Sequence, residues 1–512
     1  MLVKTYGCAV YGINATIVTI EFSSSEGFNF FLVGLPDNAV KESQQRIEAA
    51  LRNIGYKMPG KKLIINMAPA DIRKEGSAYD LPLAIGILAI EGAIKPDKFN
   101  DYVIMGELSL DGTVQPIKGS LPIALEAQKN GFKGIILPLQ NAHEAAVVDN
   151  LEVYGIKNLS QLISFFNNNQ ELEKVNINIK EEFNNNLNHY EEDFADVKGQ
   201  ENVKRALEVA AAGGHNILMI GPPGSGKTML AKRLPTILPP LTLEEALETT
   251  KIHSVAGKIN HFSSLITTRP FRSPHHTTSD VALVGGGSYP QPGEISLAHN
   301  GVLFLDELPE FKRSVLEVLR QPLEDRKIII SRSKFSIEYP ASFMLVASMN
   351  PCPCGYFNHP EKQCACNPGL VKKYLNRISG PLLDRIDIHI EVVPVKIEKL
   401  TENFKIESSI EIRKRVIKAR EIQFNRFKFY KNIHCNAQMN PNLIKKFCIL
   451  GDEEKNLLKN AIEKLGLSAR AYDRILKVSR TIADLDNSET IKTFHLAEAI
   501  QYRNLDRDYW NK

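Results

Sequence analysis

A glycine-rich run of eight residues, GPPGSGKT at positions 221–228, restricts the fold of this chain more than any other stretch of its sequence. The apolar run NILMI precedes it, and the helix-forming sequence MLAKR follows it. A strand, a tight turn and a helix in this order form a phosphate-binding loop, because glycines let successive backbone N–H groups converge on an anion at the helix N-terminus. The chain is therefore predicted to contain a parallel α/β sheet that binds ATP.

Every residue of this loop is a candidate for nucleotide binding. Lys227 is expected to reach the β- and γ-phosphates, and the hydroxyl of Thr228 is expected to hold Mg²⁺. The alternative is a glycine-rich turn that contains Lys-Thr by chance, and the flanking strand and helix argue against it. The candidate residues for binding ATP are Gly221, Pro222, Pro223, Gly224, Ser225, Gly226, Lys227 and Thr228.

Two further strand-like runs end in polar residues that suit the same chemistry. The run Gly301–Leu305 leads into Asp306, a candidate Mg²⁺ ligand, and Glu307, which is expected to polarise the attacking water. The run Phe343–Ala347 leads to Asn350, which would lie beside the same phosphates. Without the first two motifs, Asn350 would be interpreted as an ordinary turn residue.

The chain has 512 residues, enough for about three domains. An N-terminal domain is predicted at 1–165. A segment rich in Asn, Glu and Lys is predicted to be a linker at 166–192. Strand-like runs, the first of them Asn216–Ile220, alternate with helical patterns over 193–395. The last part, 396–512, is predicted to be helical, with helical patterns at Glu411–Phe429, Asn456–Leu465 and Ala471–Asp484.

Composition is that of a globular protein, with 43% hydrophobic and 24% charged residues. A net charge of +4 neither requires nor excludes DNA as a partner. The longest apolar run, Leu81–Ile90, is too short for a bilayer, which needs about 20 apolar residues. The N-terminus lacks the charged and apolar regions of a signal peptide, so a cytoplasmic protein without a membrane partner is expected.

Four of the seven cysteines form two closely spaced pairs, Cys352 with Cys354 and Cys364 with Cys366. In a reducing compartment such a cluster indicates a metal rather than disulfides, and four thiolates suit a tetrahedral Zn²⁺. The C-x-C spacing is less usual than C-x-x-C, so four reduced thiols are the alternative. His359, between the pairs, is a further candidate that could replace one cysteine.

With these motifs in order, the chain resembles the ComM/YifB family of bacterial magnesium-chelatase-like AAA+ ATPases. The resemblance runs nearly end to end, and its most specific stretches are 196–216, 270–280, 283–311 and 377–392. It implies a P-loop AAA+ sheet domain, a C-terminal helical lid and a ring, expected to be a homo-hexamer. It also implies a helicase that acts on DNA and promotes branch migration during recombination of incoming single strands.

The resemblance assigns further roles to single residues. Asn350 matches the sensor-one position, Arg385 in LLDRID matches the arginine finger, and Arg470 in SARAYDR matches sensor two. Arg377 and Arg474 lie in the same motifs, and either an exchange of roles or a structural ion pair remains open for them. The candidate catalytic residues are Glu307, Lys227, Asn350, Arg385 and Arg470.

Residues 1 to about 165 resemble the protease domain of Lon, an α+β fold of the ribosomal-S5 type that also occurs as a non-proteolytic module in the recombination ATPase RadA. Ala78 falls where that protease has its serine nucleophile, and Leu121 falls where it has its lysine base. Neither side chain can attack a carbonyl or accept a proton, so a scaffold or a DNA-facing collar is expected. A substitute pair of Ser77 and Lys118 is the alternative.

Candidate DNA contacts lie in a predicted hairpin and in an insertion. Strands at Lys327–Ile330 and Phe335–Ile337 are predicted to form a hairpin, in the position where related MCM-type helicases have a pore hairpin. Arg332 and Lys334 near its tip would contact phosphates, or the tip would simply be solvated. An insertion at 270–280 is a second pore loop or a subunit interface, and its candidates are Arg272, His275 and His276.

The leading hypothesis is therefore an ATP-hydrolysing ring motor that acts on single-stranded or branched DNA. The alternative is a magnesium-chelatase-like or protein-remodelling ATPase that does not translocate DNA. Stimulation of ATP hydrolysis by DNA would distinguish the two.

Overall fold

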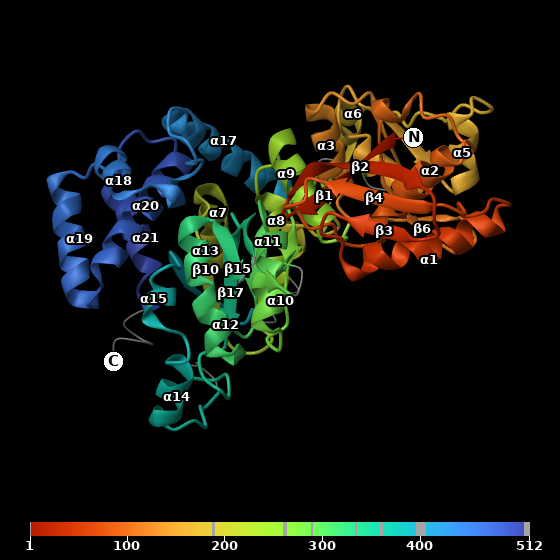
Figure 1. The fold of residues 1–512 in the computed structure, drawn as a ribbon. Helices are drawn as coiled ribbons and strands as arrows, with labels where there is room; N and C mark the ends of the chain where they lie inside the picture. The colour runs from red at the N-terminus through yellow and green to blue at the C-terminus, as the bar shows by residue number, and fades with distance from the viewer. Residues whose placement is uncertain are drawn as a thin grey trace. The chain divides into compact units, whose positions relative to one another are not determined.

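The computed structural model describes residues 2–186, 190–259, 264–287, 290–332, 335–357, 362–395 and 406–505. The chain forms two compact units, each with its own sheet (Figure 1). The first unit comprises Met1–Asn186, Thr242–Thr267 and Pro290–Pro292, and the second comprises Leu187–Leu241, Thr268–Tyr289 and Gly293–Lys512. The predicted domain boundaries remain a proposal; within the predicted linker, the structure has helix α6 (Ile179–Asn186).

The first unit is built on a mixed sheet of seven strands in the order β3-β4-β2-β1-β5-β8-β9. Strands β1 and β2 form a long antiparallel hairpin, whereas β5, β8 and β9 are parallel. Alternating buried positions along β2, such as Val18, Ile20 and Phe22, place one face of the sheet on the core. The strands are β1 (Leu2–Tyr11), β2 (Asn14–Ser25), β3 (Phe30–Val33), β4 (Lys62–Ala68), β5 (Tyr102–Ile104), β8 (Gly134–Pro138) and β9 (Glu152–Ile156).

Helices of the first unit complete its mixed α/β architecture, as predicted. The apolar run that is too short for a membrane forms α2 (Asp80–Ile90), in which every residue is buried. Helix α9 (Leu243–Val255) also belongs to this unit, where it packs against α3. In the described residues, no helix has the length and hydrophobicity needed to cross a membrane. The other helices are α1 (Asn38–Asn53), α3 (Ser120–Lys129), α4 (Leu139–Ala145) and α5 (Leu159–Phe166).

The second unit contains a parallel five-stranded sheet in the order β11-β14-β17-β10-β18. The three predicted buried strands are confirmed as β10 (Ile217–Ile220), β14 (Val302–Leu305) and β17 (Met344–Met349). All their residues are buried, as expected for central strands. The outer strands are β11 (Phe271–Arg272) and β18 (Ile388–Glu391).

Helices follow the sheet and form the C-terminal lid. The three predicted lid helices are confirmed as α17 (Ser409–Phe427), α19 (Asp452–Leu465) and α20 (Ala469–Leu485). One hydrophobic cluster runs from the sheet into the lid and includes Phe304 and Ile475, so the two parts share a core. The remaining helices of ten or more residues are α7 (Glu201–Gly213) and α8 (Lys227–Ile237). The shorter ones are α10 (Asp280–Val284), α11 (Glu294–Leu297), α12 (Arg313–Val318), α13 (Arg320–Asp325), α14 (Pro368–Leu375), α15 (Gly380–Leu383), α18 (Pro441–Phe447) and α21 (Thr493–Gln501).

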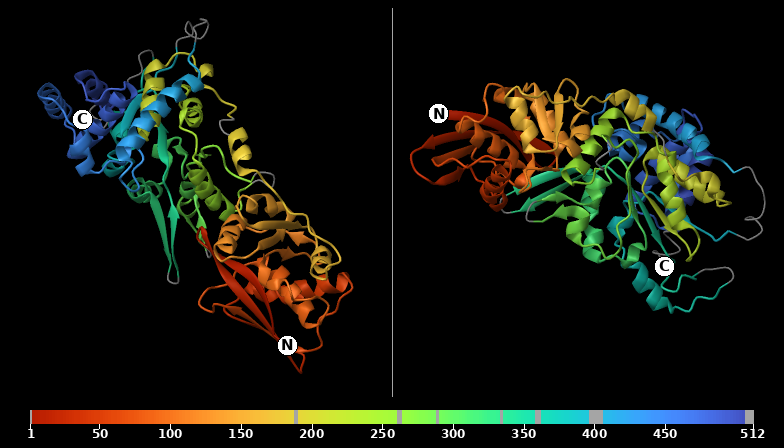
Figure 2. Two further views of the ribbon diagram at one scale, coloured as in Figure 1. Left: turned by 90° about the horizontal axis from the view of Figure 1, so that it is seen from above. Right: turned by 90° about the vertical axis from the view of Figure 1, so that its right-hand side faces the viewer.

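The predicted hairpin is also confirmed. Strands β15 (Lys327–Arg332) and β16 (Phe335–Pro340) pair antiparallel over their full length, and both are longer than predicted. Figure 2 shows them as a two-stranded ribbon that extends from the second unit. The candidate contact Lys334 lies outside the described residues, as does the candidate metal ligand His359.

Candidate functional site

The glycine-rich loop joins the end of β10 to the start of α8, as its sequence predicts. Gly224 and Gly226 have φ angles of 78° and 87°, which glycine adopts at little cost. A Cβ atom on Gly221 would lie 2.3 Å from the carbonyl oxygen of Val392, so this position has room for glycine only. The N–H of Gly221 donates to the carbonyl of Met349 at 3.1 Å, which ties the loop to the end of β17.

Lys227 is buried against its own loop. Its ammonium group donates to the carbonyls of Gly221 at 2.8 Å and Pro222 at 2.9 Å, and to the side-chain oxygen of Asn350 at 3.3 Å. Burial lowers the pKa of this ammonium group, while the charges of Asp306 and Glu307 oppose that effect. The structure therefore brings Asn350 to the loop lysine from a different strand, as the parallel sheet predicts.

The Mg²⁺ candidates Thr228 and Asp306 lie together. The hydroxyl of Thr228 donates to the Asp306 carboxylate at 2.7 Å, and the hydroxyl of Ser348 on β17 donates to the other oxygen of that carboxylate. A hydroxyl and a carboxylate at the N-terminus of a helix are hard oxygen donors of the kind that Mg²⁺ prefers. The residues present therefore fit Mg²⁺ and the phosphates of a nucleotide, with Ser348 as a participant that the sequence analysis missed.

Glu307 has an unexpected partner. Its carboxylate lies 3.2 Å from Nδ1 of His276, and its backbone has a left-handed φ of 53°. His276 follows β11, which pairs with β14, the strand that delivers Glu307. The rings of His275 and His276 lie 4.0 Å apart, so the insertion holds His276 in place. The carboxyl ends of neighbouring parallel strands lie at one edge of a sheet, so a predicted strand at β11 would have indicated this contact. The sequence of β11 did not predict a strand.

The proposed arginine finger and sensor two are held in ion pairs within the chain. Arg385 is buried, donates to the carbonyl of Pro381 and pairs with the Glu324 carboxylate, both at 2.5 Å. Arg470 is exposed and lies 3.3 Å from the carboxylate of Asp384. In the described part of the chain, neither guanidinium bonds to the loop or to the acidic pair, so the structure does not bring these candidates to the nucleotide site.

The two neighbouring arginines also have partners within the chain. Arg377 lies 2.8 Å from Glu310, and Arg474 lies 3.1 Å from the buried carboxylate of Asp387. Burial alone would raise the pKa of Asp387. The Arg474 guanidinium and the His215 ring, which lies 3.0 Å away, instead hold this pKa well below its usual range. These contacts favour structural ion pairs for Arg377 and Arg474, the alternative that the motifs left open. In the insertion, Arg272 pairs with Glu294 through two bonds of 2.6 and 2.8 Å.

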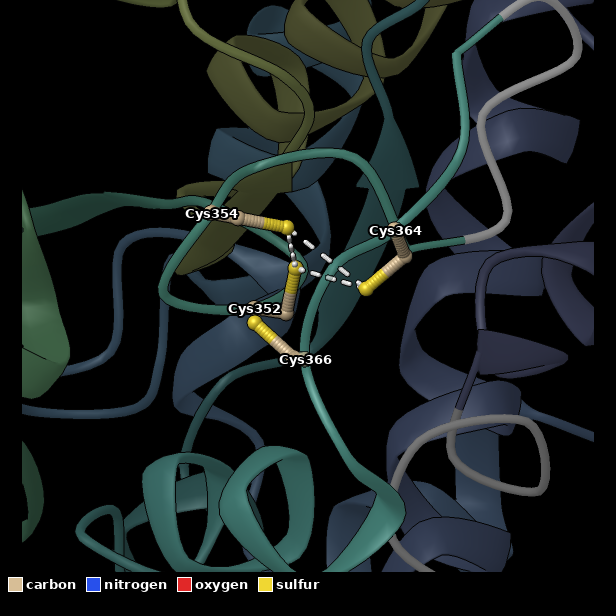
Figure 3. A group of neighbouring side chains, drawn as sticks. All are labelled: Cys352, Cys354, Cys364 and Cys366. Atoms are coloured by element: carbon tan, nitrogen blue, oxygen red, sulfur yellow. Dashed lines mark hydrogen bonds between the residues drawn. The ribbon is translucent and has the colours of Figure 1, made fainter.

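The four clustered cysteines meet at one point (Figure 3). The sulfur of Cys352 lies 3.3 Å from that of Cys354 and 3.7 Å from that of Cys364, and the latter two are 3.5 Å apart. The sulfur atoms of all four, Cys366 included, lie within 4.8 Å of one another. A tetrahedron of sulfurs about 2.3 Å from a central Zn²⁺ has edges of about 3.8 Å, so the cluster fits this metal.

One thiol of the cysteine cluster has a lowered pKa, and the loop that carries the cluster contacts the phosphate loop. Hydrogen bonding from the backbone N–H of Tyr356 lowers the pKa of the Cys354 thiol to about 6, which favours the thiolate that metals bind. Gly355 packs against Pro223 of the phosphate loop, and a Cβ atom there would lie 2.5 Å from the proline ring. The order of the cysteine loop therefore affects the position of the phosphate loop.

The residues at the two positions of the Lon dyad lie in the first unit. Leu121 is fully buried on α3, and Ala78 contributes a backbone carbonyl to Gly106. The hydroxyl of Ser77 donates to the carboxylate of Glu107. Among the described residues, Ser77 and Lys118 are not bonded to each other, so nothing supports the substitute pair.

Comparison with known proteins agrees with this geometry. Residues 193–400 match the family model described as magnesium chelatase subunit ChlI, 20–141 match a model for subunit ChlI of magnesium chelatase, and 406–503 match the ChlI C-terminal model. The chain is 45% identical to the competence protein ComM of Haemophilus influenzae over 99% of this chain and 98% of that protein. It is 44% identical to the protein YifB of Escherichia coli over 98% and 96%. Lon protease 2 of Bacillus subtilis is 31% identical over 28% of this chain and 27% of that protein.

The parallel sheet, the phosphate loop and the acidic pair define an AAA-type ATPase of the magnesium-chelatase class. The identity extends over both units and the lid, far beyond the phosphate loop. The chain belongs to the ComM/YifB family of magnesium-chelatase-like proteins.

Proposed function

We propose that the protein is an ATP-hydrolysing ring motor that acts on DNA and drives branch migration in homologous recombination and natural transformation. The observation that carries the proposal is the convergence of Lys227, Thr228, Asp306 and Asn350 at the carboxyl edge of one parallel sheet. Bound Mg²⁺ supplies charge neutralisation of the phosphates. The loop binds the phosphates, Lys227 and Asn350 orient them, Asp306 and Thr228 hold the metal, and Glu307 polarises the attacking water.

Assembly into a homo-hexameric ring is the second part of the proposal. In it, Arg385 leaves its ion pair with Glu324 and reaches the nucleotide of a neighbouring subunit, while Arg470 acts on the nucleotide of its own subunit. Because Arg385 is buried in the single chain, hydrolysis would depend on assembly.

This assignment is tested by mixing two inactive variants. We expect Lys227→Ala to lose ATP binding, and Arg385→Ala to bind ATP but hydrolyse it at least about a hundredfold more slowly. Their mixture should recover part of the activity, because one variant supplies the finger and the other the intact loop. Glu307→Gln, which binds ATP without turnover, is the control for assembly. Rings that form normally and show no recovery at any mixing ratio would contradict a finger in trans.

DNA is proposed as the substrate on two grounds. The Haemophilus relative is named a competence protein, and the hairpin β15–β16 presents a basic sequence directly before the strand that ends beside Asn350. Arg332 and Lys334 near its tip are proposed phosphate contacts. The family models are named for a magnesium chelatase, so a metal-insertion or protein-remodelling motor is the second candidate. ATP hydrolysis that DNA leaves unchanged would favour that candidate.

The four-cysteine cluster is proposed to hold one structural Zn²⁺. Four sulfurs that lie within 4.8 Å of one another support this assignment. The metal would fix the loop that packs on Pro223 and thereby support the phosphate loop.

A further inference from the structure

A groove of about 820 Å³ lies on the second unit, outside the nucleotide site. One wall is the segment 309–313, which leads into α12, and the other is formed by α14 and the residues after it. Figure 1 shows α12 and α14 next to each other at one end of this unit. Its charged lining residues are Glu310, Lys312, Arg313, Lys372, Lys373 and Arg377.

The charge of this groove is strongly positive. Five of its lining residues are Lys or Arg and one is acidic, and the acidic residue, Glu310, is already paired with Arg377 at 2.8 Å. The other four cations, all exposed, have no ion-pair partner in the described part of the chain, and they are Lys312, Arg313, Lys372 and Lys373. Like charges held together raise the energy of the free protein, so a polyanion that enters the groove would relieve their repulsion.

Both walls of the groove are connected to the nucleotide site. The first wall starts directly after Glu307, which caps the short helix at Leu308–Glu310. The second wall follows Cys366, and its residue Tyr374 is buried and accepts a hydrogen bond at its hydroxyl from the backbone of Asn350. A ligand that moves the walls therefore acts on both strand ends that face the nucleotide.

We propose that this groove binds the phosphate backbone of single-stranded DNA, an inference that rests on the proposed DNA function. The groove offers cations but no exposed ring, because its one aromatic side chain, Phe311, is buried. Bases stack on exposed aromatic rings, whereas lysines and arginines contact phosphates without regard to sequence. A groove of this composition suits a motor that moves along any DNA, and it is separate from the hairpin β15–β16.

The test is the salt dependence of single-stranded DNA binding by the full chain. The variant Lys372→Gln, Lys373→Gln removes two phosphate contacts, so the slope of log K against log salt should become shallower by about 1.4, from about 0.7 for each contact. The matched control is Lys414→Gln, Lys418→Gln, which removes two exposed lysines from α17. We expect the control to keep the parental slope and both variants to keep the parental melting temperature and DNA-free ATP hydrolysis.

The outcomes separate this inference from the proposed function. A parent protein that does not bind single-stranded DNA would overturn the DNA function itself. A parent that binds, with the same slope for the Lys372–Lys373 variant as for the parent, would overturn the groove alone. A variant that binds DNA like the parent but has a raised KM for ATP would assign these lysines to a nucleotide of a neighbouring subunit, which also contradicts the proposal.

Discussion

The contact between Glu307 and His276 changes how the proposed water-activating residue is understood. A carboxylate that lies against an imidazole at this distance is a weaker acceptor for water, because the contact stabilises its charge. The imidazole comes from the insertion at 270–280, which the sequence analysis could assign only to a pore loop or an interface. We therefore expect His276 to restrain Glu307 while no DNA is bound.

Removing this restraint should raise hydrolysis. His276→Ala is expected to increase DNA-free kcat by about threefold to fivefold, with KM for ATP unchanged, since a partly exposed ion pair contributes up to about 1 kcal/mol. His276→Asn, whose amide N–H can replace Nδ1, should restore the parental rate. His143→Ala is the control, because it removes an exposed histidine on α4 of the first unit. A slower His276→Ala enzyme would mean that the imidazole holds Glu307 in its productive position.

Single residues also show how far the sequence could predict the site. Lys227, Asp306 and Asn350 could be predicted to meet because each follows a buried strand, and parallel strands end at one edge. The partner of Arg385 could not be predicted, since Glu324 lies on α13 and the pairing depends on how that helix packs against the turn that follows α15. The contact of Glu307 with His276 could not be predicted either. It depends on the pairing of the two-residue strand β11, whose sequence gives no strand signal.

At the level of elements, the cysteine loop is the part for which a structural metal is proposed. Between β17 and α14, the described residues 350–357 and 362–367 form no helix or strand. Its sulfurs are brought together without a disulfide, as expected of a metal site. The sequence predicted the four ligands, but the packing of Gly355 on the phosphate loop could be seen only in the structure.

Metal analysis tests this element. Protein purified without chelators should contain about one Zn²⁺ per chain, and the double change Cys352→Ser, Cys366→Ser should lose it because two ligands cannot hold the ion tightly. That variant should also melt several degrees lower, at roughly 2–4 °C for each kcal/mol lost, and bind ATP more weakly. Cys448→Ser, which changes a cysteine outside the cluster, should keep the zinc. Parent protein without zinc would disprove the site.

The longer helices and the hairpin were easier to predict than the unit to which each element belongs. Apolar spacing predicted α19 and α20, and two short strand-like runs around a serine-containing turn predicted the hairpin β15–β16, because both patterns are local. The membership of α9 in the first unit was not predicted, since it depends on contacts with α3 more than a hundred residues earlier in the chain.

On the scale of the whole molecule, the proposed motor has parts that are separate in the single chain. The phosphate loop and its acidic pair are already assembled, whereas Arg385 is held by Glu324 and His276 holds Glu307. Ring assembly would release the first contact and DNA the second. Hydrolysis would then be limited to a ring that carries DNA, which a motor needs in order to avoid idle turnover.

The most direct test of this claim is strand displacement on a forked DNA with one labelled strand. The parent protein with ATP and Mg²⁺ is expected to displace the strand, and the fork should raise its rate of ATP hydrolysis. Glu307→Gln should bind the fork without displacing the strand. The account would be contradicted if the parent hydrolysed ATP at the same rate with and without the fork and left the labelled strand in place.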